Sequence, residues 1–249
     1  MTEIPKSHPR YASLVLRERL VEGFREGLVV PQGLIAHGRG EMFYYLLGEK
    51  TTKEARAACK AAAALLLTAK HPVISVNGNV AALCPESVVE LAEACGAKIE
   101  VGLFHRSDIR VSKIIKALED AGAKVVFGFL PDGRIPGLES MRGLCSKDGI
   151  GSADVVVIPL EDGDRAGALA AMGKKTIAVD LNPLSRTARS STVTIVDEVT
   201  KAFPEVTRCV ESLEGDRASI RRAIDGYRRD DNLRSILGVM ARNMDRLEK

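Results

Sequence analysis

Tryptophan is absent from the 249-residue chain, and aromatic side chains make up only 4% of it. The core must therefore be built mainly from aliphatic side chains, for which the 45% apolar fraction leaves enough material. The five cysteines are odd in number and form no C-x-x-C pair, which argues against a disulfide framework or a structural zinc site and favours reduced thiols. None of the four histidines stands in an H-x-x-H or H-E-x-x-H pattern, so no histidine-based metal site is expected.

Long apolar runs and a strong net charge are also missing. The longest apolar run, residues 61–69, is too short to span a bilayer, and the opening MTEIPKSHPR lacks the pattern of a secretion signal. We therefore expect a cytoplasmic protein with no membrane partner. A net charge of +3 gives no reason to expect nucleic acid as the main partner, and the acid-interrupted basic run RRAIDGYRRDDN favours a solvated helix face.

Short apolar segments alternate with helical ones through the middle of the chain. Runs rich in β-branched residues predict strands at 73–76, 98–104, 124–130, 154–160, 175–181 and 192–197. Helices are predicted between them at 86–95, 108–121 and 165–172. This alternation is typical of an α/β fold in which a parallel sheet is covered by helices on both faces.

The segments on either side of this core are predicted to be helical. Residues 1–70 hold a helix over 9–27, a glycine-rich loop over 31–40, a short helix over 41–48 and a long helix to about residue 70, opened by a capping box of Thr51 and Glu54. The α/β core then occupies residues 71–200, and C-terminal helices fill residues 201–249. We expect the three segments to form one compact domain.

Polar residues collect in the loops that leave the predicted strands. These loops read VNGNVA, FHRS, LPDGRIPG, PLEDGDRAG and DLNPLSRTA, whereas the loops that enter strands are short and plain. Ligands of open parallel sheets bind beyond the carboxyl ends of the strands, so the sequence predicts a site at that edge. No G-x-G-x-x-G follows a strand and no G-x-x-x-x-G-K-[ST] occurs, so any nucleotide would be bound by a less common arrangement.

Two arginines in the N-terminal segment are candidates for binding an anion. Arg17 lies within an apolar helical stripe, where it is either paired or extended to solvent, or presents its guanidinium to a phosphate or carboxylate. Arg39 lies between Gly38 and Gly40, directly before the predicted short helix, which indicates either an anion site at a helix N-terminus or a plain turn. His37, in the same loop, is interpreted as a structural histidine with its hydrogen bonds satisfied.

Two of the loops after strands carry acidic groups. Glu161, Asp162 and Asp164 can hold Mg²⁺ through bound water, or cap the helix that follows. Asp180 ends the next strand, where a ribose-binding acid can sit, and Arg186 can reach a phosphate. The Asn-Pro pair between them otherwise indicates a turn.

Five segments together resemble a known family. IPKSHPRY, LIAHGRGE, VISVNGNVAAL, IPLEDGDR and DLNPLSRTA followed by TVTIVD occur in the family's order, and over residues 4–204 the sequence resembles archaeal phosphopantothenate synthetases. That family consists of the 4-phosphopantoate–β-alanine ligases of coenzyme A biosynthesis. The resemblance implies a Rossmann-like homodimer that converts 4-phosphopantoate, β-alanine and ATP to 4′-phosphopantothenate, AMP and pyrophosphate.

The resemblance also carries over residue by residue. By matching positions it implies ATP contacts at Arg17, Arg39, Asp180, Leu181, Asn182, Arg186, Thr187, Glu198 and Val199. The chain departs from the family pattern at three positions. Glu198 stands where Asn is more common, Tyr44 where an acid is expected, and His105 where Tyr is usual.

The chemistry that fits is adenylation of the pantoate carboxylate, followed by attack of the β-alanine amine. Arg17, Arg39 and Arg186 are assigned to phosphates, and Asp162 or Asp164 to Mg²⁺. Asn77 and Asn79 are candidates for substrate or phosphate contacts, Arg165 binds the substrate phosphate or is a surface arginine, and no residue is assigned as general base. The alternatives are another nucleotide-dependent transferase or kinase, and a non-catalytic nucleotide-binding regulator.

Overall fold

A six-stranded sheet forms the centre of the computed structural model, which describes residues 4–245. Its strands are β1 Pro72–Val76, β2 Lys98–Val101, β3 Val126–Phe127, β6 Val155–Pro159, β7 Lys175–Val179 and β8 Val193–Ile195. They lie in the order β3-β2-β1-β6-β7-β8, and every neighbouring pair is parallel. The predicted α/β fold with a parallel sheet is confirmed. The first strand, β1, ends at Val76 as predicted, and the other five end earlier than predicted because the polar loops begin there.

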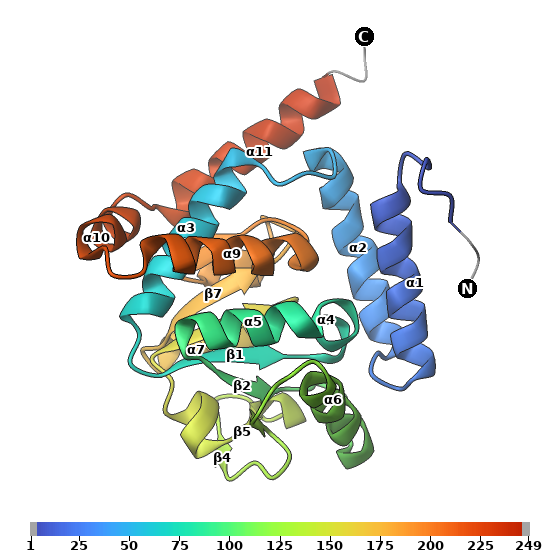
Figure 1. Cartoon of the computed structure of the whole chain (residues 1–249), viewed down its shortest axis with the longest axis vertical. Coiled ribbons are helices and arrows are strands. Elements are labelled where there is room, and N and C mark those ends of the chain that lie inside the picture. The colour runs from blue at the N-terminus through green and yellow to red at the C-terminus, as the bar shows by residue number, and fades with distance from the viewer. Residues whose placement is uncertain (1–3, 246–249) are drawn as a thin grey trace.

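Helices cover both faces of this sheet. On one face pack α3 (Lys53–Thr68), α5 (Pro85–Cys95), α6 (Asp108–Asp120) and α9 (Val199–Leu213). On the other lies α7 (Gly163–Ala171). Figure 1 shows α5 and α9 in front of the strands. Each face of the sheet has its own apolar cluster, and successive residues of β6 point into them alternately. Val155 and Val157 belong to the larger cluster, and Val156 and Ile158 to the smaller one.

The direction of winding reverses between β1 and β6. From β1 the chain runs outward through β2 to β3, then returns to the other side of β1 and runs outward again through β7 to β8. This is the order of a doubly wound Rossmann-like sheet, and the crevice at the reversal is where such sheets bind ligands.

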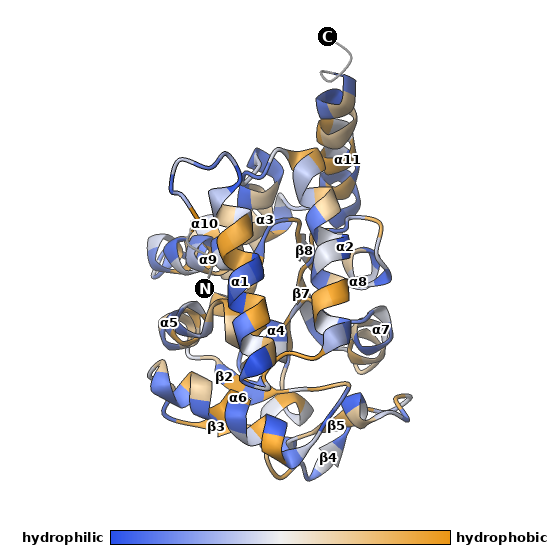
Figure 2. Cartoon of the chain, turned by 90° about the vertical axis from the view of Figure 1, so that its right-hand side faces the viewer, coloured by the Kyte–Doolittle hydropathy of each residue, from blue (hydrophilic) through white to orange (hydrophobic). Residues whose placement is uncertain are grey.

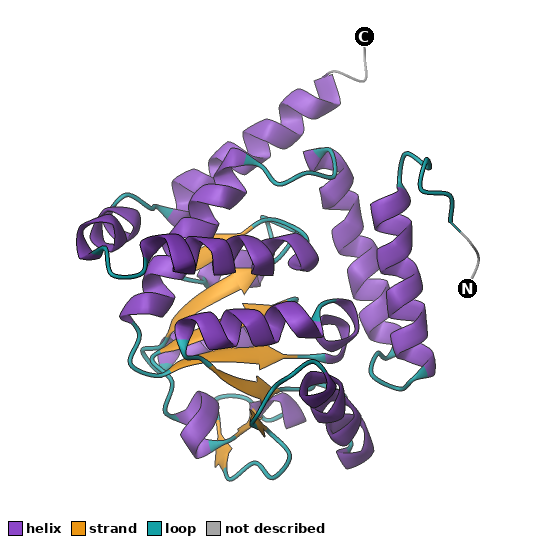
Figure 3. Ribbon diagram, viewed as in Figure 1, coloured by secondary structure: helices purple, strands orange, loops and turns teal. Residues whose placement is uncertain are grey.

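Two N-terminal helices stand beyond the carboxyl edge of the sheet. They are α1 (Tyr11–Arg25) and α2 (Pro31–Leu47), which lie side by side in Figure 3 and stand in front of β7 and β8 in Figure 2. α1 contacts the short helix α4 (Gly78–Leu83), and α2 packs on the C-terminal helix α11 (Arg229–Asp245). The contact with α11 belongs to a separate apolar cluster formed by Leu47, Val196, Leu233, Ile236 and Met240. These contacts hold α1 and α2 opposite the carboxyl ends of the strands.

The predicted glycine-rich loop over 31–40 is wrong, because α2 runs without interruption from Pro31 to Leu47. Pro31 occupies the first turn, where its missing N–H costs nothing, and Gly48 ends the helix with a left-handed φ of 78°. Burial of Tyr44 and Leu47 outweighs the weak helix propensity of the internal glycines. Arg39 is therefore inside a helix, not at its N-terminus.

The predicted capping box of Thr51 and Glu54 is wrong, because the helix begins one residue later and has Ala55 at the position where a box needs Glu or Gln. Thr52, not Thr51, caps α3 by accepting a hydrogen bond from the Ala55 amide at 3.0 Å. Thr51 donates instead to the Asp197 carboxylate at 2.6 Å, which ties the start of α3 to the end of β8.

The remaining elements are short or C-terminal. They are α8 (Arg186–Ser190), α10 (Arg217–Asp225), the hairpin of β4 (Gly133–Arg134) and β5 (Leu144–Cys145), the 3-10 turn η1 (Met141–Gly143) and the π-helical turn η2 (Lys147–Gly151). The predicted C-terminal helices are confirmed, apart from residues 246–249, which lie outside the described residues, as do residues 1–3 of the predicted N-terminal segment. All five cysteines are free: Cys59, Cys84 and Cys145 are buried, and Cys95 and Cys209 are partly exposed. Between residues 4 and 245, no helix combines the length and apolarity needed to cross a membrane.

Candidate active site

A cavity of about 880 Å³ lies between the carboxyl edge of the sheet and α2, a size typical of small-molecule sites. The loops after β1, β2, β6 and β7 line it, together with residues of α2, α6 and η1. Its charged and polar lining consists of Gln32, His37, Arg39, Asn77, Asn79, His105, Arg110, Arg142, Glu161, Asp162, Asp180, Asn182, Ser185, Arg186 and Thr187. Four of the five polar loops that leave strands thus meet at this cavity, as their composition predicts, whereas the loop after β3, residues 130–137, does not line it.

Four of the lining residues are arginines. Arg39 is exposed and has no carboxylate partner among the described residues, so its guanidinium is available to a ligand. The Arg186 side chain is 75% exposed, and its Nη2 lies 2.8 Å from Asp164 Oδ1. Arg110 and Arg142 approach from the side of β2. Guanidinium groups gathered in one cavity favour phosphate or carboxylate ligands.

Arg17 is not among the residues that line this cavity. Its Nε and Nη2 donate to the Glu41 carboxylate on α2, the Nη2 bond measuring 2.8 Å, and Nη2 also donates to the Tyr45 hydroxyl at 2.9 Å. Arg10 binds the same carboxylate at 3.1 Å. Arg17 therefore forms the structural ion pair that was its alternative interpretation, and it fixes α1 against the helix that carries Arg39.

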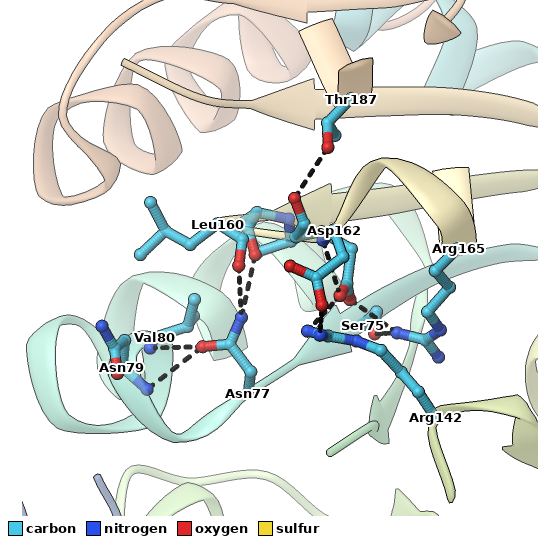
Figure 4. A network of polar contacts seen from close by, with 11 residues as sticks. Ser75, Asn77, Asn79, Val80, Arg142, Leu160, Asp162, Arg165 and Thr187 are labelled. Carbon is cyan, nitrogen blue, oxygen red and sulfur yellow. Dashed lines mark hydrogen bonds and ion pairs between the residues drawn. The ribbon is translucent and has the colours of Figure 1, made fainter. Parts of the chain in front are cut away.

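The loop after β6 contains a buried chain of charges, shown in Figure 4. Glu161 accepts a hydrogen bond from Arg165 at 2.7 Å and also pairs with Arg142, which in turn contacts Asp162. Asp162 occupies the N-cap position of α7 but makes no capping hydrogen bond with its side chain. The loop is thus held by guanidinium–carboxylate contacts, not by a helix cap.

Arg165 is completely buried and makes a second hydrogen bond, to the Ser75 hydroxyl, at 2.7 Å. The predicted contact with a substrate phosphate and the surface-arginine alternative both disagree with this position, because the guanidinium is enclosed beneath the loop. The position instead suits a structural role, since a buried charge is stable only when it is paired.

Asn77 and Asn79 line the cavity, and both side chains hold its walls together. Asn77 Oδ1 accepts from the amides of Asn79 and Val80 at the start of α4, while Nδ2 donates to the carbonyl of Pro159 at 3.0 Å. This side chain therefore connects β1 to β6 across the point of reversal. Asn79 Nδ2 donates to the Gly33 carbonyl of α2 at 2.9 Å.

The loop after β7 is a compact polar turn. Asp180 accepts from the Asn182 amide at 2.9 Å and from the Ser185 hydroxyl, and burial raises the pKa of its carboxyl group. Thr187 donates to the Glu161 carbonyl at 2.7 Å, which joins this turn to the loop after β6. Leu181 and Asn182 line the cavity between them.

Glu198 and Val199 are buried at the start of α9 and do not line the cavity. Glu198 caps this helix by accepting from the Thr200 amide at 2.7 Å, and burial raises the pKa of its carboxyl group. Tyr44, at the second position that departs from the family pattern, places its hydroxyl against Lys201 Nζ. Burial raises the Tyr44 pKa, and the nearby carboxylates of Asp197 and Glu198 raise it further.

His37 does not behave as a satisfied structural histidine. It is buried and lines the cavity, and its Nε2 has no hydrogen-bond partner among the described residues. Burial lowers the pKa of its imidazole, so the neutral form is favoured. For metals, residues 4–245 hold no group of three or more His, Cys, Asp or Glu side chains placed to bind an ion.

The sequence did not single out Arg110 or Arg142. A signal for Arg110 existed, because it stands just after the FHRS loop that follows β2, at the third residue of α6. Arg142 lies in the segment between β3 and β6, which contains the β4–β5 hairpin, so it does not follow a strand of the main sheet. Only the folded chain brings it to the cavity.

A doubly wound sheet with an arginine-lined cavity at its reversal defines an α/β protein suited to phosphorylated small molecules. The chain belongs to the family described as Phosphopantothenate/pantothenate synthetase, whose sequence model matches residues 54–243.

Three relatives are each named 4-phosphopantoate–beta-alanine ligase. The protein of Thermococcus onnurineus is 49% identical over 251 residues, covering 100% of this chain and 95% of its own length. That of Thermococcus kodakarensis is 47% identical with the same coverage. That of Methanospirillum hungatei is 53% identical over 224 residues, covering 90% of this chain and 91% of its own.

Proposed function

We propose that this chain is an ATP-dependent ligase that joins 4-phosphopantoate to β-alanine and releases 4′-phosphopantothenate, AMP and pyrophosphate. Membership of the family and the names of its relatives support this proposal. The observation that carries it is the presence of Arg39, Arg110, Arg142 and Arg186 in one cavity at the reversal of the sheet. A triphosphate, a phosphomonoester and a carboxylate held near one another require this density of cations.

For the nucleotide, we assign the end of the cavity next to β7. Arg39 and Arg186 bind phosphates there, and Asp180 accepts a hydrogen bond from the ribose. The assignment is supported by the open guanidinium of Arg39 and by the position of Asp180 at a strand end, with Leu181, Asn182 and Thr187 beside it. In this proposal Arg17 does not touch the nucleotide but holds α2 in place through Glu41. Glu198 and Val199 act indirectly as well, as buried residues at the start of α9.

The reaction proceeds in two steps. A carboxylate oxygen of the pantoate attacks the α-phosphorus of ATP, the bond to the β-phosphate oxygen breaks, and pyrophosphate leaves. The neutral amine of β-alanine then attacks the acyl carbon, AMP leaves with the electrons of the broken C–O bond, and the nitrogen releases one proton to solvent as the amide forms. Because the protein forms no covalent bond in either step, positioning and charge stabilisation supply most of the rate.

Mg²⁺ fits this site as a companion of the nucleotide. Such ions are held by one or two carboxylates together with phosphate oxygens, and Asp162 and Asp164 are the exposed carboxylates of the loop after β6. Each is paired with an arginine, so the ion would replace a guanidinium at one of them. When bound, Mg²⁺ supplies charge neutralisation at the phosphates.

A homodimer is part of the proposal. The helices α1 and α2 expose Phe24, Ile35 and Met42, with exposed fractions of 44%, 63% and 63%, and Met42 also lines the cavity. Large apolar side chains left in water on neighbouring helices favour contact with a second copy.

The test is an incubation of the purified chain with ATP, Mg²⁺, 4-phosphopantoate and β-alanine, assayed for nucleotide products and the amide. AMP and pyrophosphate should appear in equal amounts with 4′-phosphopantothenate, and only when both organic substrates are present. Release of ADP would identify a kinase instead. Binding of ATP without turnover would indicate a regulator.

A further inference from the structure

Arg110 and Arg142 are neighbouring cations in the cavity: Arg142 lies over the ring of Phe104, which follows β2, and it also reaches Asp162 in the loop after β6. The order of the strands separates Arg110 from Arg186, because Arg110 follows β2 and Arg186 follows β7, three positions along the sheet. At about 4.8 Å per strand, these positions are about 14 Å apart. One cavity therefore offers cations at two places, as two phosphorylated ligands would require.

Arg110 has no acidic partner among the described residues. Its Nε donates to the Leu28 carbonyl at 2.8 Å and its Nη1 to the His105 carbonyl at 2.8 Å, so two of its nitrogens are anchored to backbone. Burial and the neighbouring charge of Arg142 lower the pKa of its guanidinium. A half-buried cation next to another cation is stabilised when an anion binds between them.

Arg142 reaches the same part of the cavity from outside the sheet. Its side chain is only 11% exposed, lies 5.8 Å over the Phe104 ring and pairs with Glu161 and Asp162. Its Nε is buried and has no hydrogen-bond partner among residues 4–245. Of its two carboxylate partners, Asp162 is 57% exposed and Glu161 is 1% exposed, so Asp162 is the one that a substrate phosphate can replace.

The buried partner holds this arginine in place. Glu161 binds Arg142 through Oε1 and Arg165 through Oε2, and Arg165 is fixed in turn by Ser75 on β1. The charge chain therefore runs from the centre of the sheet to the cavity. Since Arg142 belongs to a short turn after a hairpin, it needs this contact to keep a single orientation.

We propose that Arg110 and Arg142 form the subsite for the phosphate of the acid substrate, and that Glu161, held by Arg165, is the positioning residue for Arg142. This inference rests on the proposed function, because it assigns 4-phosphopantoate to the end of the cavity next to β2. The nucleotide then occupies the other end, and the carboxylate to be activated lies between them.

The test compares steady-state constants of the wild type with those of Arg142→Gln and Arg110→Gln. Each change should raise the KM for 4-phosphopantoate about tenfold or more while the KM for ATP changes less than about threefold, since one charged phosphate contact is lost. Arg142→Lys should recover part of the loss, because it restores the charge but not the planar fork. The matched control is Arg208→Gln, an arginine of α9 with 69% of its side chain exposed and paired to Glu205. A rise in the KM for ATP alone, or no rise in either constant, would overturn the subsite.

The positioning role is tested with Glu161→Gln and the double variant Arg142→Gln/Glu161→Gln. Glu161→Gln alone should raise the KM for 4-phosphopantoate, and in the double variant it should add nothing to the effect of Arg142→Gln, because it acts through that side chain. Additive effects would show that Glu161 supports the fold only. Thermal melting of each variant accompanies the kinetics.

Equilibrium binding keeps this proposal separate from the proposed function. Calorimetry with 4-phosphopantoate and with plain pantoate needs no turnover. Wild type should bind the phosphorylated acid more tightly, and Arg142→Gln should abolish the difference. A protein that binds the acid in this way but releases no AMP would contradict the ligase proposal and keep the subsite, whereas turnover with no preference for the phosphorylated acid would do the reverse.

Discussion

Individual arginines in this chain have very different surroundings, and the surroundings set their roles. Arg165 is enclosed and paired, Arg17 is bound to Glu41, and Arg39 faces the cavity without a carboxylate partner among the described residues. The sequence pointed to Arg17 and Arg39 by their apolar or glycine-rich neighbours, but it could not distinguish a partner carboxylate from a ligand. Glu41, 24 residues from Arg17 in the chain, is the partner that only the folded structure supplies.

Arg39→Lys tests the nucleotide end of the cavity. Lysine keeps the charge but loses the planar fork that binds two phosphate oxygens, so kcat/KM for ATP should fall about tenfold or more, which is about 1.4 kcal/mol. The measurement is steady-state AMP formation at varied ATP, with Arg208→Gln as the control. Turnover within about twofold of wild type would remove Arg39 from the phosphate contacts.

Arg17→Ala addresses a different expectation. The family resemblance implies that Arg17 contacts ATP, in which case its loss should reduce activity by orders of magnitude while the protein stays folded. In the structure the same change also leaves the buried Glu41 with Arg10 as its remaining arginine partner, so the melting temperature should fall as well. Activity and melting temperature measured on the same sample separate the two roles. An inactive variant with an unchanged melting temperature would support a direct contact with ligand.

At the scale of elements, the sequence predicts the strands and their helices well and the first helical pair less well. Runs such as VVVI of β6 are unambiguous, because they are apolar on both faces and bounded by polar turns. The first ten residues of α2 are not predicted to be helical, because three glycines and a proline stand among them. Its stability comes from contacts with α4 and α11, which are distant in the chain and cannot be read from local propensity.

The glycines of α2 give a matched pair of substitutions. A Cβ at Gly38 would meet nothing within 4 Å, so Gly38→Ala should stabilise the protein by about 0.5–1 kcal/mol through helix propensity. A Cβ at Gly33 would lie 2.3 Å from Asn79 Oδ1, so Gly33→Ala should destabilise it and disturb the cavity wall. Thermal melting should show a rise of a few degrees for the first and a fall for the second. Equal shifts in the same direction would contradict the packing of α2 on the loop after β1.

For the whole molecule, the order of the strands determines where the site lies. The reversal of winding between β1 and β6 leaves a crevice between these two strands. Asn77, after β1, spans it by donating a hydrogen bond to the Pro159 carbonyl of β6. The sequence predicts which edge of the sheet is functional but not the strand order, because pairing partners are set by long-range packing. The excursion that carries Arg142 shows the same limit, since a residue between β3 and β6 reaches the cavity only after the sheet is assembled.

The proposed homodimer can be tested at the exposed apolar side chains of α2. Ile35 and Met42 are seven residues apart on α2, so they share one side of the helix, and both are 63% exposed. Ile35→Glu places a charge on this surface, which should convert a dimer into a monomer because burial of an unpaired carboxylate is strongly unfavourable. Light scattering after size-exclusion chromatography measures the mass. Val125→Glu, 65% exposed next to the edge strand β3, is the control and should remain dimeric. If Ile35→Glu stays dimeric and Val125→Glu does not, the contact between copies lies at the β3 edge, not on the helical pair that closes the cavity.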